Sequence, residues 1–215
     1  MKRKVLWFLE SIYPPIAAWR ANSQLQKRMA KQLEDYQASI DKWLEIIGEK
    51  VSDPLLVGET ESIERAETQR KEAIEAKASS LTAALGISIT LLVLVPAIMG
   101  KGWGLPIPVA WVVALTLILA VVHFLVAAYY ALRVSKVAAF FVTSTETMKT
   151  LLKKQDDQMD QARILATKLA NTEMNIPTLI VKTNCLAVAQ TLFLRGIIFF
   201  GVGASIALIS KVISG

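Results

Sequence analysis

The sequence predicts an all-α membrane protein with three transmembrane helices and long cytosolic helices that are amphipathic or coiled-coil-like. Of its 215 residues, 53% are hydrophobic and 20% are charged, and the mean hydropathy is +0.44. Most of the charges lie apart from three apolar stretches, each long enough for the roughly 30 Å hydrocarbon core of a bilayer. At this length we expect one structural unit rather than two independently folding domains.

Residues 1–79 are predicted to form a cytosolic helical region that opens with a basic arm. A helix over residues 16–48 follows, because apolar residues recur there at intervals of three and four, and Gly48 suits its end. These residues are Leu25, Met29, Leu33, Tyr36, Ile40, Trp43 and Ile47. A second helix is predicted over residues 59–79, with glutamates in its first turns, and it continues into the membrane.

Residues 80–132 are predicted to form a transmembrane hairpin. Ser80 to Met99 is uncharged, and at 1.5 Å per residue it can cross the bilayer core. A turn rich in glycine and proline follows, with Trp103 and Trp111 as interface anchors, and Val109 to Leu132 crosses back. The turn carries only Lys101, whereas both flanks are rich in Lys and Arg, so the positive-inside rule predicts a cytosolic N-terminus.

Residues 133–178 are predicted to form a cytosolic, coiled-coil-like helix that breaks between Asn171 and Pro177. Its seam repeats at four and three residues. The seam comprises Met148, Leu152, Gln155, Met159, Ala162, Ala166 and Leu169. Residues 179–215 then hold a membrane-proximal segment and a third span.

The third span is either Gly196 to Gly215 or a longer stretch from Leu186 with Arg195 inside the membrane. The first is favoured, because an unpaired Arg in lipid costs at least about 2.5 kcal/mol. It predicts a periplasmic C-terminus. Small residues in this span favour close helix packing. The small residues concerned are Gly196, Gly201, Gly203 and Ser205.

Catalysis is not predicted. The sequence has one cysteine, Cys185, and one histidine, so a single chain can assemble neither a disulfide framework nor a Cys/His zinc site. It shows no Ser/His/Asp or Cys/His arrangement outside the apolar spans, no glycine-rich phosphate loop and no metal-ligand spacing. We therefore expect no enzyme, no metal and no cofactor.

One face of the first span is small and hydroxylated, which makes it a candidate pore lining. The residues are Ser79, Thr82, Ala83, Gly86 and Thr90. Close helix packing uses the same residue types, and in a symmetric oligomer both interpretations hold together. His123 in the second span is an intramembrane ionisable group that could gate or relay protons, or bond to a neighbouring helix as neutral imidazole.

A candidate ligand-binding set lies on the first cytosolic helix, where cations stand near an aromatic ring. A phosphodiester ligand with a stacked base needs that combination, although a solvated amphipathic helix has it as well. The set comprises Trp19, Arg20, Lys27, Arg28 and Lys31.

Residues 65–95, with an Arg/Glu-rich helix that passes through Lys77-Ala78 directly into a span, resemble small bacterial anti-phage membrane effectors. These include the transmembrane effectors of Pycsar systems and the membrane effector of the Hailong system. The resemblance implies a pore-forming effector in a bacterial inner membrane, controlled by a nucleotide or oligonucleotide that a partner nucleotidyltransferase or cyclase makes. Because three spans per subunit make a poor pore alone, we expect a symmetric homo-oligomer, with a tetramer as the favoured assembly. The competing interpretation is a non-conducting membrane anchor whose coiled-coil-like helices recruit a partner protein.

Overall fold

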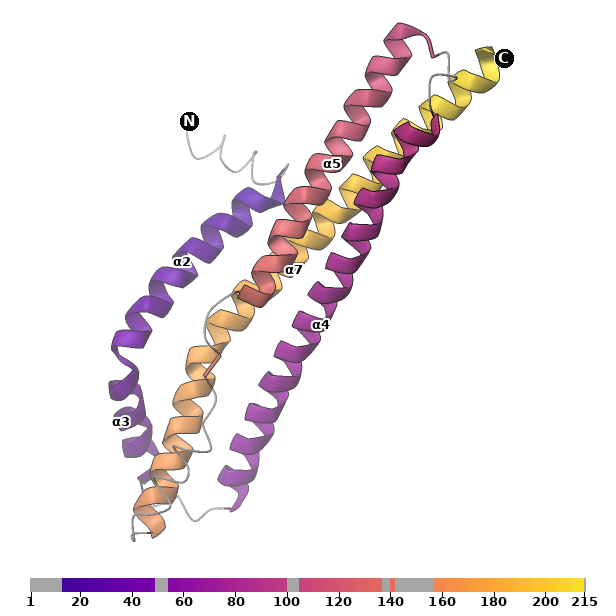
Figure 1. Ribbon diagram of the computed structural model, residues 1–215. Coiled ribbons are helices and arrows are strands. Elements are labelled where there is room, and N and C mark those ends of the chain that lie inside the picture. The colour runs from indigo at the N-terminus through magenta and orange to yellow at the C-terminus, as the bar shows by residue number, and fades with distance from the viewer. Residues whose placement is uncertain (1–12, 49–53, 100–104, 137–139, 142–156, 215) are drawn as a thin grey trace, which may run out of the picture. The chain divides into compact units, whose positions relative to one another are not determined.

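The computed structural model describes residues 13–48, 54–99, 105–136, 140–141 and 157–214, and these are almost entirely helical (Figure 1). The described helices are α2 (Pro14–Glu34), α3 (Tyr36–Ile47), α4 (Pro54–Met99), α5 (Ile107–Lys136) and α7 (Asp157–Ser214). The all-α class is thus confirmed. The basic arm, Trp103, and the seam residues Met148, Leu152 and Gln155 lie outside the described residues.

The chain forms two compact units. The first unit comprises residues 1–18, 75–136 and 183–215, and the second unit comprises residues 19–74 and 137–182. Because α4 and α7 are long, each contributes residues to both units. The sequence-based division at residues 79, 132 and 178 is a different one, and it stays a prediction.

The single helix predicted over residues 16–48 is instead two helices that meet at Asp35. Asp35 still donates its backbone N–H to the Lys31 carbonyl and accepts from Ser39, so the interruption is one residue long. Aspartate is a poor interior helix residue because its side chain competes for backbone groups. Gly48 ends α3 as predicted, with a φ of 43°.

Helix α4 begins at Pro54, earlier than the predicted Glu59, and continues without a break to Met99. Proline suits the first turn of a helix, because its φ is already helical and the first N–H groups have no partner within the helix. The prediction that one helix runs from Glu59 past Ser80 is therefore confirmed, and the helix has one further turn before Glu59.

Helix α7 runs unbroken from Asp157 to Ser214, so the predicted break between Asn171 and Pro177 is wrong. Pro177 removes the N–H that would bond to the Glu173 carbonyl, yet the helix continues past it. The side chains of Asn171 and Asn175 hydrogen-bond to segments far away in the chain. Tertiary contacts thus hold a helix that local propensity alone would end.

In the first unit, α5 packs against the second half of α7 and runs in the opposite direction (Figure 1). The rings of Phe124 and Phe193 lie 5.7 Å apart. A Cβ added at Gly203 would lie 2.5 Å from Thr116 Oγ1, so the missing side chain lets the two helices approach. The packing role predicted for this glycine is confirmed.

Two helices are long and apolar enough to cross a membrane: α5 over Ile107–Lys136, and the part of α7 over Gln161–Ile213. The core helix of a soluble protein is mostly buried, whereas only 17% and 22% of these two apolar windows are buried. Trp111 and Ile118 of α5 are 73% and 60% exposed. Large apolar side chains are therefore exposed to the surroundings on both helices.

The second unit has its own hydrophobic core where α3 meets the first part of α7. Ala162 and Ala166, two residues of the predicted seam, are buried there against Ile40 and Ile47, and Leu169 packs beside them. In this part of α7, the predicted seam positions therefore do face a neighbouring helix.

Candidate functional site: a buried polar seam on α7

Polar side chains replace the apolar ones along the buried side of α7, directly after the core of the second unit. We call them the polar seam. They are Lys168, Asn171, Asn175, Thr178 and Lys182, and all are at most 9% exposed. Their spacing of three, four, three and four residues places them on one face of the helix. Buried polar groups are costly unless they are hydrogen-bonded, so their partners indicate what the seam holds together.

Asn171 connects the seam to α3. The Tyr36 hydroxyl donates a hydrogen bond of 2.6 Å to Asn171 Oδ1. Burial raises the pKa of the Tyr36 hydroxyl above its usual 10.0, so it remains a proton donor at neutral pH. The contact fixes the register of α3 against α7.

Asn175 binds the backbone of Phe141 through both ends of its amide. Its Oδ1 accepts from the Phe141 N–H at 2.8 Å, and its Nδ2 donates to the Phe141 carbonyl at 2.9 Å. The same side chain hydrogen-bonds to Glu67 of α4, whose pKa is raised above 4.5, chiefly because burial disfavours the charged carboxylate. Asn175 therefore joins α4, α7 and Phe141.

Lys168 pairs with α4. Its Nζ lies 3.3 Å from Glu64 and 3.7 Å from Glu61, and its side chain is 11% exposed. These three residues, with Arg65 and Thr68, line an open recess of about 400 Å³. The pairing compensates the charge of a nearly buried ammonium group.

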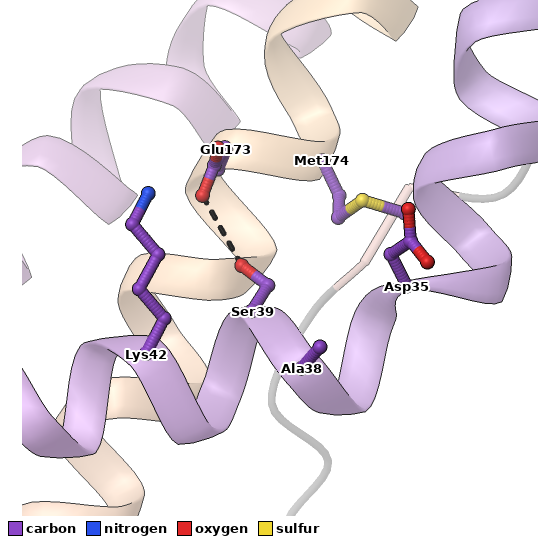
Figure 2. A pocket seen from close by; sticks show the side chains of 6 residues that line it. All are labelled: Asp35, Ala38, Ser39, Lys42, Glu173 and Met174. Carbon is purple, nitrogen blue, oxygen red and sulfur yellow. Dashed lines mark hydrogen bonds between the residues drawn. The ribbon is translucent and has the colours of Figure 1, made fainter.

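Glu173, beside the seam, receives two hydrogen bonds from α3. Ser39 Oγ donates at 3.1 Å and Trp43 Nε1 at 3.2 Å, both to Oε2. Figure 2 shows the first of these bonds at the edge of a recess of about 350 Å³, with Lys42 and Asp35 on the α3 side. One cation and two carboxylates line the recess, so its charge selects neither a simple anion nor a simple cation.

No family model, no curated protein and no solved structure matches the chain.

The predicted pore-lining residues of α4 lie mainly on an open surface of the first unit. Ser79, Ala83, Gly86 and Thr90 are exposed, and Thr82 is half-buried. A Cβ added at Gly86 would meet no atom within 4 Å. We call Ser79, Ala83, Gly86 and Thr90 the small-residue face. Its role in conduction stays a prediction.

His123 lies elsewhere, on the α5 side that meets α7. Its Nδ1 is 2.7 Å from the Leu119 carbonyl, and its ring centre is 5.1 Å from that of Phe199. Because a carbonyl oxygen only accepts, Nδ1 is the donor in this contact. The ring thus contacts the backbone of its own helix and an aromatic side chain of α7. A gating role also stays a prediction.

The predicted ligand-binding residues are all exposed on α2: Trp19, Arg20, Lys27, Arg28 and Lys31. Trp19 is 62% exposed. Neither of the two recesses described above is lined by any of them. Within the described residues, no group of three or more His, Cys, Asp or Glu side chains gathers as metal ligands would.

The sequence interpretation missed the polar seam. Its signal was present: Lys168, Asn171, Asn175, Thr178 and Lys182 repeat at the same three and four spacing as the apolar seam before them. Because Pro177 and two asparagines are typical of a helix end, the local signals predict a break in that stretch.

Proposed function

We propose that the protein is a homo-oligomeric membrane effector in which α4 helices of several copies pack around an ion-conducting pore. In this arrangement three helices per chain cross a bacterial inner membrane: the second half of α4, α5 and the second half of α7. The N-terminus is cytosolic and the C-terminus periplasmic, and a tetramer is the assembly we expect first.

The observation that carries this proposal is the small-residue face of α4. Gly86 and Thr90 are exposed in a single chain, and a side chain at Gly86 would meet only open space. Lipid-embedded helices approach one another through small residues, so a second copy is the natural occupant of this face. Helices packed closely about a symmetry axis also enclose a narrow path.

The apolar exterior supports the membrane setting. Leu115 of α5 and Leu208 of α7 are 59% and 57% exposed, and they belong to long faces of the same kind. Exposing this much apolar surface to water is unfavourable by roughly 25 cal/mol per Å². Lipid removes that cost.

Control by a cytosolic nucleotide or oligonucleotide, with a nucleotidyltransferase or cyclase as the partner enzyme, completes the proposal. It draws on the resemblance of residues 65–95 to anti-phage effectors and on the exposed cations of α2. A ligand can open or close a pore only if it binds the two states with different affinity.

A second candidate is a non-conducting anchor, and one observation favours it. The hydroxyls of Thr82, Ser88 and Thr90 each donate at 2.9 Å to a carbonyl one turn back in α4. Hydroxyls satisfied in this way need no water, so α4 can also pass between other helices without lining a pore.

Ion flux from liposomes that contain the purified protein separates the two candidates. We expect the wild type to leak a monovalent cation in at least one ligand state, and Gly86→Leu to abolish the leak by filling the helix interface. Ala110→Leu, which enlarges a small exposed residue of α5, is the matched control and should leave flux unchanged. Absence of wild-type flux with and without cyclic nucleotides or short oligonucleotides would reject the pore and retain the anchor.

A further inference from the structure

The backbone of Phe141 is bound as if by a neighbouring β-strand, although the partner is a single side chain. Asn175 accepts from its N–H at 2.8 Å and donates to its carbonyl at 2.9 Å. A primary amide carries one carbonyl and two N–H donors, so it can satisfy both backbone groups of one residue at once. This recognition depends on the backbone and not on the Phe141 side chain.

The rings of Phe140 and Phe141 have partners of their own. The Phe141 ring stacks on Tyr36 of α3, with centres 5.7 Å apart and planes inclined by 28°. Lys71 Nζ of α4 lies 4.9 Å from the centre of the Phe140 ring, within the range of a cation–π interaction. Three helices therefore each contribute one residue: α3 contributes Tyr36, α4 contributes Lys71 and α7 contributes Asn175.

None of these contacts belongs to a helix ladder. Phe140 and Phe141 lie outside the helices and are only half-buried. Their removal would break no backbone hydrogen bond within α3, α4 or α7. The free energy that holds them is thus separable from the free energy that holds the three helices together.

We propose that Phe140–Phe141 is a releasable latch, and that Asn175, Tyr36 and Lys71 form its seat. The latch opens by a local event, while α3, α4 and α7 stay folded. It follows Lys136, the last residue of α5, by a few positions in the chain, and it belongs to the second unit. This inference does not depend on ion conduction.

Peptide-resolved hydrogen exchange of the full chain in detergent micelles tests the latch. In the wild type, the amide of Phe141 should exchange faster than the buried α7 amides near Val181, because only a local opening exposes it. Asn175→Ala should accelerate Phe141 exchange about tenfold or more, as expected for the loss of hydrogen bonds to one residue. Exchange of the α7 amides near Val181 should increase much less than exchange at Phe141, although the contact of Asn175 with Glu67 is lost as well.

Thr178→Ala is the matched control, because Thr178 lies on the same seam and its buried Oγ1 has no hydrogen-bond partner among the described residues. It should change exchange at neither position. The proposal is overturned if Phe141 exchanges only as fast as the α7 core, or if Asn175→Ala accelerates both equally, since the contact would then open only with global unfolding.

Lys71→Met provides a second variant that keeps the side-chain length and removes the charge. It needs no buried substitution, so it serves even where Asn175→Ala fails to fold. We expect acceleration at Phe140–Phe141 of roughly two- to fivefold, in line with a partly exposed cation–π contact. No acceleration at that dipeptide would contradict the latch.

Discussion

The ring of Phe124 in α5 occupies the space beside Gly196 of α7 that any side chain at residue 196 would need. Phe124 is itself 1% exposed, so the ring has little room to move away. The absence of a Cβ at Gly196 therefore sets how closely α5 and α7 pack. Gly196→Ala should destabilise the protein by about 1–3 kcal/mol, the usual cost of overpacking a tight interface.

Gly201 supplies the matched control for this substitution. It lies on the same helix, and a Cβ added there would meet no atom within 4 Å. Gly201→Ala should therefore be neutral or slightly stabilising, because alanine favours helix. Thermal unfolding in detergent, followed by circular dichroism, measures both variants. Equal melting temperatures for the two would contradict the close contact.

Tyr36→Phe tests the connection between α3 and the polar seam. The substitution keeps the ring and removes the 2.6 Å hydrogen bond to the buried Asn171. We expect a loss of about 1–3 kcal/mol in the free energy of unfolding, because a buried acceptor loses its donor. Tyr129→Phe, at a residue that is 59% exposed, is the control and should have almost no effect.

Glu67 predicts a pH dependence of stability. Burial raises its pKa above 4.5; Glu64 adds to the rise, while Asn175 and Arg70 oppose it. The folded protein therefore holds this proton to a higher pH than the unfolded chain. As pH increases from 4.5 through the raised pKa, the folded state loses that advantage and stability falls.

Glu67→Gln should remove this part of the pH dependence and make the protein more stable than the wild type at neutral pH. The amide keeps a hydrogen-bonding group toward Asn175 and carries no charge. Glu72→Gln, at an exposed residue of the same helix, is the control. Melting temperatures measured across the acidic to neutral range check the prediction, and parallel curves for Glu67→Gln and the wild type would argue against it.

If the proposed pore and the latch are both present, they should be coupled. Substituting both Phe140 and Phe141 with Ala should then change liposome ion flux at least about tenfold, the effect of roughly 1.4 kcal/mol on the closed-to-open equilibrium. If the wild type conducts and the double variant shows the same flux, the latch does not control the pore. A silent wild type would reject conduction, and hydrogen exchange would still decide the latch.

The sequence predicts the helices well wherever periodicity and end signals agree. Gly48 ends a helix with a positive φ, and α4 passes through Ser80 without a break, as its uniform helical pattern indicates. Ala162 and Ala166 are buried at the predicted seam positions. Each of these outcomes depends on local signals, which a single sequence contains.

The prediction failed where long-range contacts override local preference. Asn171 and Pro177 are typical of a helix end, yet α7 continues because Tyr36 and Phe141, both far away in the chain, satisfy the asparagine side chains. The seat of Phe140–Phe141 was not predictable either. It combines residues from three helices, and nothing in their local spacing connects them.

Alkaline carbonate extraction of membranes from cells that express the full chain tests the central claim, that lipid surrounds the exposed apolar faces of α5 and α7. Peripheral proteins are released by this treatment, whereas helices that span the bilayer stay in the pellet because removing their apolar surface from lipid is unfavourable. We predict that the wild type stays in the pellet and dissolves only in detergent. Recovery of the chain as a monodisperse species in the detergent-free supernatant would contradict the account.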